Sequence, residues 1–115
     1  MTEMTVSRSG DRFDINISGH AGSGAYGSDI VCAAVSSHFY TLAQAMTDHN
    51  AEIHTLDVSE AEGKAELSVT APTPEQQAII TAVCRGLKLL SLFYPNNLAV
   101  DMGEDEGALP GLQIL

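Results

Sequence analysis

The chain has 115 residues, of which 44% are hydrophobic, and its formal net charge is −10 from 15 acidic and 5 basic residues. This length predicts a single domain over residues 1–115, with enough apolar residues to build a core without a metal or a disulfide. The acidic balance argues against binding to nucleic acid through phosphates, and against an anionic membrane surface, because both require clustered lysine and arginine. It suits a basic partner, although acidic charge also serves solubility alone.

The N-terminal segment does not join basic residues to a long apolar run, so we expect no signal peptide. The wholly apolar runs are much shorter than the ~20 residues of a membrane span, so we expect no membrane contact. A cytoplasmic protein is therefore predicted. In a reducing compartment the two cysteines, Cys32 and Cys84, are expected to be free thiols.

Two short strands are predicted at the start of the chain. Met4–Val6 is the first candidate, and apolar and polar residues then alternate over Phe13–Ile17, as in a half-buried strand. The turn residues Ser9–Asp11 between them favour a hairpin. A glycine-rich loop follows over residues 19–28.

A helix is predicted from about Asp29, because apolar residues then recur every three or four positions. These residues would form one buried face: Val31, Val35, Phe39, Leu42 and Met46. Ser28 or Asp29 can cap the start of the helix with a side-chain oxygen. The helix is expected to end near Asp48–Asn50.

A second hairpin and a second helix are predicted next. Ile53–Val58 is a ragged strand candidate, Ser59–Gly63 is a polar turn, and Ala65–Ala71 is an alternating strand. Thr73 is expected to cap the helix, with Pro74 at its first position and Gln76 closing a capping box. Its buried stripe would comprise Ile79, Ile80, Val83, Leu87, Leu90 and Tyr94.

Pro95 is expected to end this helix, and Leu98–Met102 alternates as a last strand. From about residue 103 the chain has no clear period, which is typical of a disordered tail or of one that docks on a partner subunit. The complete order is ββαββαβ. It predicts an α+β fold with a mostly antiparallel sheet and two helices packed on one face.

Cys32 is a candidate catalytic nucleophile. It lies in the first turn of the predicted helix, where the dipole and the unpaired N–H groups favour an anion. A thiolate is the form in which cysteine attacks, and a nearby histidine favours it further. The same N–H groups could later hold an oxyanion.

His20 ends the strand before the glycine-rich loop and is a candidate general base. In a strand–loop–helix unit the end of the strand and the start of the helix lie side by side. His20 can therefore reach Cys32 and later protonate a leaving amine. Asp29 could orient His20, cap the helix, or do both. The loop glycines, including Gly22, Gly24 and Gly27, would let the loop move over a substrate.

Plainer interpretations stay open for these residues. A cysteine among apolar residues is usually a small core residue, which is how we interpret Cys84 in the second helix. A histidine after a strand is usually a turn residue. His38, His49 and His54 look like ordinary helix or strand-edge positions.

Two ligand sites compete for the same loop. Residues 22–27 spell GxGxxG between a strand and a helix, the fingerprint of dinucleotide binding. We reject it because the preceding strand alternates, whereas a fingerprint strand is buried on both faces, and because no acid ends a second strand ~20 residues on. A zinc site with His20, Cys32 and a further histidine matches no compact zinc spacing. We expect no cofactor and no metal.

The stretch over residues 19–36 resembles the motif of the ribosomal-processing cysteine protease family known as Prp or YsxB-like. The matching residues are Gly19-His20-Ala21, a short loop, and Gly27-x-Asp29-Ile30-Val31-Cys32-Ala33-Ala34-x-Ser36. The order ββαββαβ also resembles the fold of that family. The Gly-Ser-Gly content at residues 22–24 and the tail from Gly103 depart from the family.

The resemblance implies a cysteine endopeptidase that removes an N-terminal extension from large-subunit ribosomal protein twenty-seven, cleaving after an aromatic residue. It implies Cys32 as nucleophile, His20 as general base, Asp29 and Ser36 as supporting residues, a mobile loop, and a homodimer. The alternative is a non-catalytic acidic module that binds a basic ribosomal protein. In either case complementary charge would speed the encounter.

Overall fold

The computed structural model describes residues 1–20, 29–47, 52–59 and 63–103. In chain order its elements are β1 (Thr2–Ser9), β2 (Arg12–Ser18), α1 (Ile30–Thr47), β3 (Glu52–Ser59), β4 (Lys64–Thr70), α2 (Pro74–Phe93) and β5 (Leu98–Asp101). The predicted order ββαββαβ is confirmed. The loop glycines Gly22, Gly24 and Gly27, and the tail after Gly103, lie outside the described residues.

The strands form one sheet in the order β3-β4-β2-β1-β5. β1 pairs with β2, β2 with β4, and β3 with β4, all antiparallel, whereas β5 runs parallel to β1. The predicted hairpins are therefore β1–β2 and β3–β4. The register of β3 shifts between Ile53 and Thr55, so His54 is an extra residue there. This bulge explains why the apolar residues of β3 do not alternate regularly.

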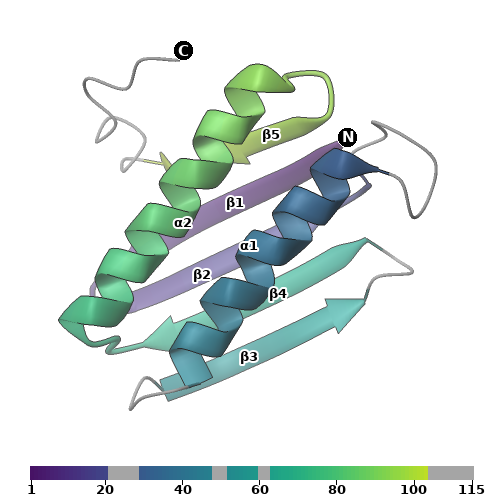
Figure 1. The fold of residues 1–115 in the computed structure, drawn as a ribbon. Helices are drawn as coiled ribbons and strands as arrows, with labels where there is room; N and C mark the ends of the chain where they lie inside the picture. Colours follow the sequence, from purple (N-terminus) through teal and green to yellow (C-terminus); the bar gives the residue numbers. More distant parts are fainter. Residues whose placement is uncertain (21–28, 48–51, 60–62, 104–115) are drawn as a thin grey trace.

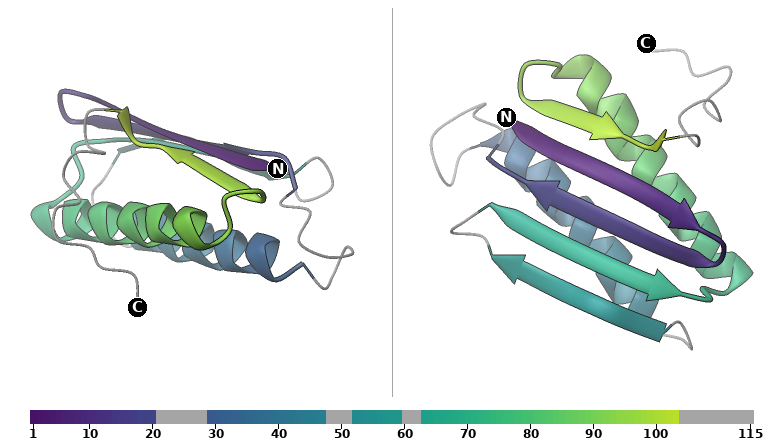
Figure 2. Two further views of the ribbon diagram at one scale, coloured as in Figure 1. Left: turned by 90° about the horizontal axis from the view of Figure 1, so that it is seen from above. Right: turned by 180° about the vertical axis from the view of Figure 1, so that it is seen from behind.

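Both helices pack on the same face of the sheet, as predicted, and run in opposite directions across it (Figures 1 and 2). The core lies between the two layers, and its largest fully buried apolar side chains include Met4, Ile15 and Leu67 from strands and Leu42, Met46 and Leu87 from helices. Cys84 is 1% exposed in α2, which confirms its interpretation as a core residue.

The start of α2 has the predicted cap. Thr73 Oγ1 accepts a hydrogen bond from the Gln76 backbone N–H at 3.2 Å, and Gln76 Oε1 accepts one from the Thr73 N–H at 2.8 Å. Gln76 is buried, and its Nε2 also donates to the Ala45 carbonyl oxygen at 3.1 Å. One side chain therefore caps α2 and ties it to α1, which fixes how the two helices pack.

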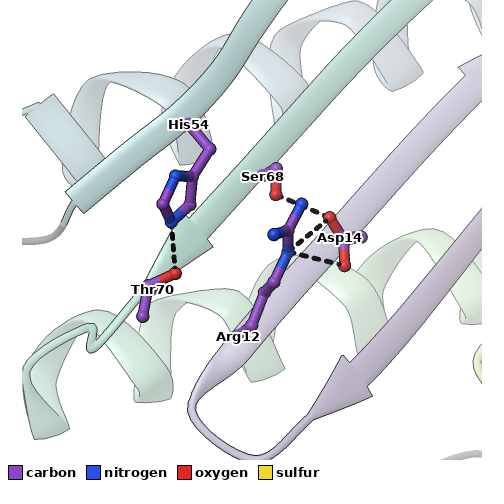
Figure 3. A network of polar contacts seen from close by, with 5 residues as sticks. All are labelled: Arg12, Asp14, His54, Ser68 and Thr70. Carbon is purple, nitrogen blue, oxygen red and sulfur yellow. Dashed lines mark hydrogen bonds and ion pairs between the residues drawn. The ribbon is translucent and has the colours of Figure 1, made fainter.

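Among the described residues no helix covers the second face of the sheet, which Figure 2 shows from behind. Polar residues of the strands lie on this face. Two hydrogen-bonded groups on it are drawn in Figure 3. Asp14 accepts from Arg12 Nε at 3.2 Å and from Ser68 Oγ at 2.6 Å. His54 contacts Thr70 Oγ1 at 2.5 Å. His54 is thus the strand-edge residue that its position predicted, and these bonds cross-link β2, β3 and β4.

Candidate active site

His20 follows the end of β2, and the glycine before it has a special backbone conformation. Gly19 has φ +87°, a region that residues with a Cβ rarely adopt. A Cβ at Gly19 would overlap the carbonyl oxygen of Met1. The N–H of Gly19 donates to the Gly63 carbonyl oxygen at 2.7 Å, and its carbonyl accepts from Thr2 Oγ1 at 2.9 Å. The backbone that leads into His20 is therefore bonded on both sides.

Cys32 is the third residue of α1, in the first turn as predicted. Asp29 comes just before the helix, and its Oδ1 accepts a hydrogen bond from the Cys32 backbone N–H at 2.9 Å. The Asp29 carbonyl oxygen accepts from the Ala33 N–H at 3.0 Å. Asp29 is thus the N-cap of α1, and it is 9% exposed. Ser28, the other capping candidate, lies outside the described residues.

The cap changes what the helix N-terminus can offer to a substrate. The sequence suggested that first-turn N–H groups could hold an oxyanion, but the Cys32 and Ala33 N–H groups are bonded to Asp29. An oxyanion that used either group would compete with the carboxylate or the carbonyl of Asp29. The side chain of Cys32 is itself half-buried, so the thiol remains reachable from the adjoining pocket.

A pocket of about 470 Å³ brings the predicted site residues together. His20, Asp29, Cys32 and Ser36 all line it. Ser36 lies one helical turn after Cys32 and is exposed. The chain N-terminus and the first turn of α1 lie at the same end of the sheet (Figure 1). The imidazole of His20, after the end of β2, and the thiol of Cys32, at the start of α1, therefore line one cavity. These two groups are the pair that cysteine–histidine acyl transfer requires.

The rest of the pocket is largely apolar. Val35 and Phe39 line it from α1, Val58 from β3 and Ala65 from β4. Such a wall next to the Cys32 thiol suits a large apolar group of a ligand. The volume lies within the usual range of small-ligand pockets, roughly 300–1,000 Å³.

Sequence reasoning missed the pocket residues that lie far from the motif. Thr2, Ser59, Gly63 and Lys64 also line the cavity. Gly63 carried a local signal in the sequence, because it is a glycine at the end of a predicted turn, and the structure gives it φ +64°. Thr2 carried no such signal in the sequence. Thr2 and Gly63 reach the pocket only because β1 and β4 flank β2 in the sheet.

The ligand-site alternatives gain no support from the fold. β2 pairs antiparallel with both of its neighbours, whereas a dinucleotide fingerprint requires a parallel β-α-β unit. Among the residues that the structure describes, no group of three or more His, Cys, Asp or Glu side chains could hold a metal ion.

Within the described part of the chain, neither helix has the length and apolar character of a transmembrane segment.

Three solved structures of bacterial proteins share this fold. The ribosomal processing protease Prp from S. aureus with a covalently linked product peptide matches at TM-score 0.79 and 20% identity, over 90% of this chain and 100% of that one. The same protease with a substrate peptide gives 0.69 and 19%, with the same coverage. SMU.848 from Streptococcus mutans gives 0.69 and 27%, over 89% of this chain and 93% of that one.

A comparison with curated protein sequences gives no match. The family model described as cysteine protease Prp matches residues 1–99. That match covers the motif over residues 19–36, both helices and the first half of β5. It confirms the resemblance inferred from the motif. The chain therefore belongs to the cysteine protease Prp family.

Proposed function

We propose that this cysteine protease is an endopeptidase that removes the N-terminal extension of large-subunit ribosomal protein twenty-seven, with Cys32 as nucleophile and His20 as general base. The observation that carries the proposal is that both side chains line one pocket in a chain of the Prp family. The S. aureus relatives are described as ribosomal processing proteases, one with a substrate peptide and one with a covalently linked product peptide.

The proposed reaction has two acyl-transfer steps. His20 accepts the proton of the Cys32 thiol, and the sulfur attacks the carbonyl carbon of the scissile peptide bond. The protonated imidazole then gives its proton to the leaving amine as the C–N bond breaks, which leaves a thioester on Cys32. Water, deprotonated by His20, attacks the thioester and releases the new carboxyl group and the free thiol.

Asp29 and Ser36 are proposed as supporting residues. Asp29 acts through the helix, because its carboxylate holds the backbone N–H of Cys32 at 2.9 Å. A fixed N-terminal turn gives the sulfur a fixed starting point for attack. Ser36 is exposed on the pocket side of α1, where its hydroxyl can bond to the backbone of a bound peptide.

The apolar wall of Val35, Phe39 and Val58 supports cleavage after an aromatic residue. An aromatic side chain buries roughly 150–250 Å² of surface, so this contact would dominate recognition of a short extension. We also propose that the chain folds as a single domain over residues 1–115. We propose that it acts as a homodimer in the cytoplasm. The net charge of −10 suits an encounter with a strongly basic ribosomal protein.

The test is cleavage of the purified ribosomal protein that carries its natural extension, followed by intact mass. We expect loss of one N-terminal fragment with the wild type and none with Cys32→Ser or His20→Ala. Cys84→Ser, which changes the buried second cysteine, is the matched control and should still cleave. Cleavage by Cys32→Ser would contradict the nucleophile, and stable binding without any mass loss would support the acidic binding module instead.

A further inference from the structure

The imidazole ring of His20 lies directly against Gly63. A Cβ built on Gly63 would lie 3.1 Å from Nε2 and 3.2 Å from Cδ2 of the ring. The backbone carbon of Gly19 is 3.1 Å from the same position. Since non-bonded carbon atoms prefer separations of about 3.5–4.0 Å, the ring occupies the space that any side chain at position 63 would need.

Gly63 also bonds to the backbone before His20. Its carbonyl oxygen accepts from the Gly19 N–H at 2.7 Å, one step beyond the Ser18–Lys64 pair that ends the β2–β4 ladder. The same residue therefore fixes the main chain on one side of His20 and provides the surface on which its ring rests.

Thr2 fixes the next peptide unit, the one that joins Gly19 to His20. Its side chain is 2% exposed, and Oγ1 donates to the Gly19 carbonyl oxygen at 2.9 Å. The Thr2 N–H donates to the Asn97 carbonyl oxygen at 2.9 Å. Thr2 is thus anchored to the turn after α2 while it holds the carbonyl group immediately before His20.

We propose that Gly63 and Thr2 are positioning residues for His20. Gly63 leaves room for the imidazole ring just before the start of β4, and Thr2 fixes the direction in which the chain enters His20. The inference rests on the proposed function, because it takes His20 as the general base. A base must stay within hydrogen-bond reach of the proton that it accepts, and a misplacement of about 1 Å can cost roughly 100-fold in rate.

Gly63→Ala and Gly10→Ala form a matched pair that separates positioning from backbone strain. Gly10 has φ +62°, almost the same as the +64° of Gly63, but a Cβ there meets nothing within 4 Å. Both variants therefore carry similar strain, and only Gly63→Ala crowds His20. We expect kcat to fall about 10- to 100-fold in Gly63→Ala with KM nearly unchanged, and both constants to be retained in Gly10→Ala. Equal kcat in the two variants would overturn the role of Gly63.

Thr2→Val and Thr2→Ser test the role of the Thr2 hydroxyl. If Gly63→Ala does not fold, these two variants test the positioning of His20 by themselves. Valine keeps the shape but leaves the Gly19 carbonyl without its donor, whereas serine keeps the donor. We expect kcat to fall about 10-fold in Thr2→Val and to be restored in Thr2→Ser, with KM similar in both. A fall in both variants, a change confined to KM, or wild-type kcat in Thr2→Val would refute positioning through the hydroxyl. Intact mass checks that all variants begin at the same residue.

His20→Ala, measured alongside, distinguishes failure of this inference from failure of the proposed function. Full activity in His20→Ala would remove the general base, and the positioning role would fail with it. Loss of activity in His20→Ala with wild-type kcat in both Gly63→Ala and Thr2→Val would leave the proposed function intact and overturn only the positioning residues.

Discussion

Asp29 shows how one side chain can serve both local structure and the site. It caps α1 through the Cys32 N–H, and it lies on the wall of the pocket that Cys32 and His20 share. The hypothesis that it caps the helix is therefore confirmed by a specific bond. The carboxylate also engages the Cys32 N–H, so an oxyanion that used this donor would have to compete with Asp29.

Replacing Asp29 should show how much its side chain contributes as the cap of α1. We expect Asp29→Ala to lower the free energy of unfolding by roughly 1 kcal/mol, because the cap is lost, while Asp29→Asn retains most of it as a good N-cap residue. Urea denaturation monitored by circular dichroism measures both values. Thr73→Ala at the cap of α2 is a control of similar cost that lies away from the pocket. Equal stability of Asp29→Ala and wild type would show that the bond adds nothing in solution.

Strand β3 shows how an element at the edge of the sheet contributes to the pocket. Leu56 and Val58 pair with Leu67 and Ala65 of β4, so their side chains point to the helix-covered face. They are nevertheless 44% and 38% exposed, which indicates that the helices leave this edge partly uncovered. Of the two, only Val58 lines the pocket, so the uncovered apolar surface becomes part of the site at the end of the strand.

A carboxylate at Val58 should weaken substrate binding. We expect Val58→Asp to raise KM for a peptide with an aromatic residue before the scissile bond, because burying apolar surface against a charge is unfavourable. Leu56→Asp adds the same charge on the same strand and face but outside the pocket, so its KM should stay near that of the wild type. Steady-state kinetics on both variants measures this. Equal KM values for the two would contradict contact between Val58 and the substrate.

At the scale of the whole molecule, negative charge collects on the uncovered face of the sheet. Strand pairing and burial place these acidic residues there: Glu3, Asp14, Glu52, Asp57, Glu66 and Asp101. Arg12 and Lys64 share that face, and Arg12 pairs with Asp14. The surface opposite the helices is thus strongly negative, and together with the net charge of −10 it attracts a basic protein from a distance.

Ionic strength should therefore act on the substrate according to its charge. We expect kcat/KM for the intact basic ribosomal protein to fall as salt rises from about 0.01 M to 0.15 M, where the screening length shortens from about 30 to 8 Å. A short uncharged peptide with the same cleavage sequence should show a flat profile. Parallel salt titrations with both substrates make the comparison. A flat profile for the intact protein would mean that long-range charge does not assist the encounter.

Sequence alone determined what depends on neighbours along the chain. Alternation located β2 and β4, three- to four-residue periodicity located both helices, and Thr73-Pro74-Glu75-Gln76 fixed the start of α2, because these signals arise from local backbone geometry and capping. The motif over residues 19–36 likewise identified the family before any fold was known.

The tertiary structure decided the parallel pairing of β5 with β1 and the choice of Asp29 as the observed cap. It also decided that Thr2, Val58 and Gly63 meet around the site, since these contacts depend on strand order and register across long separations, which local periodicity does not specify.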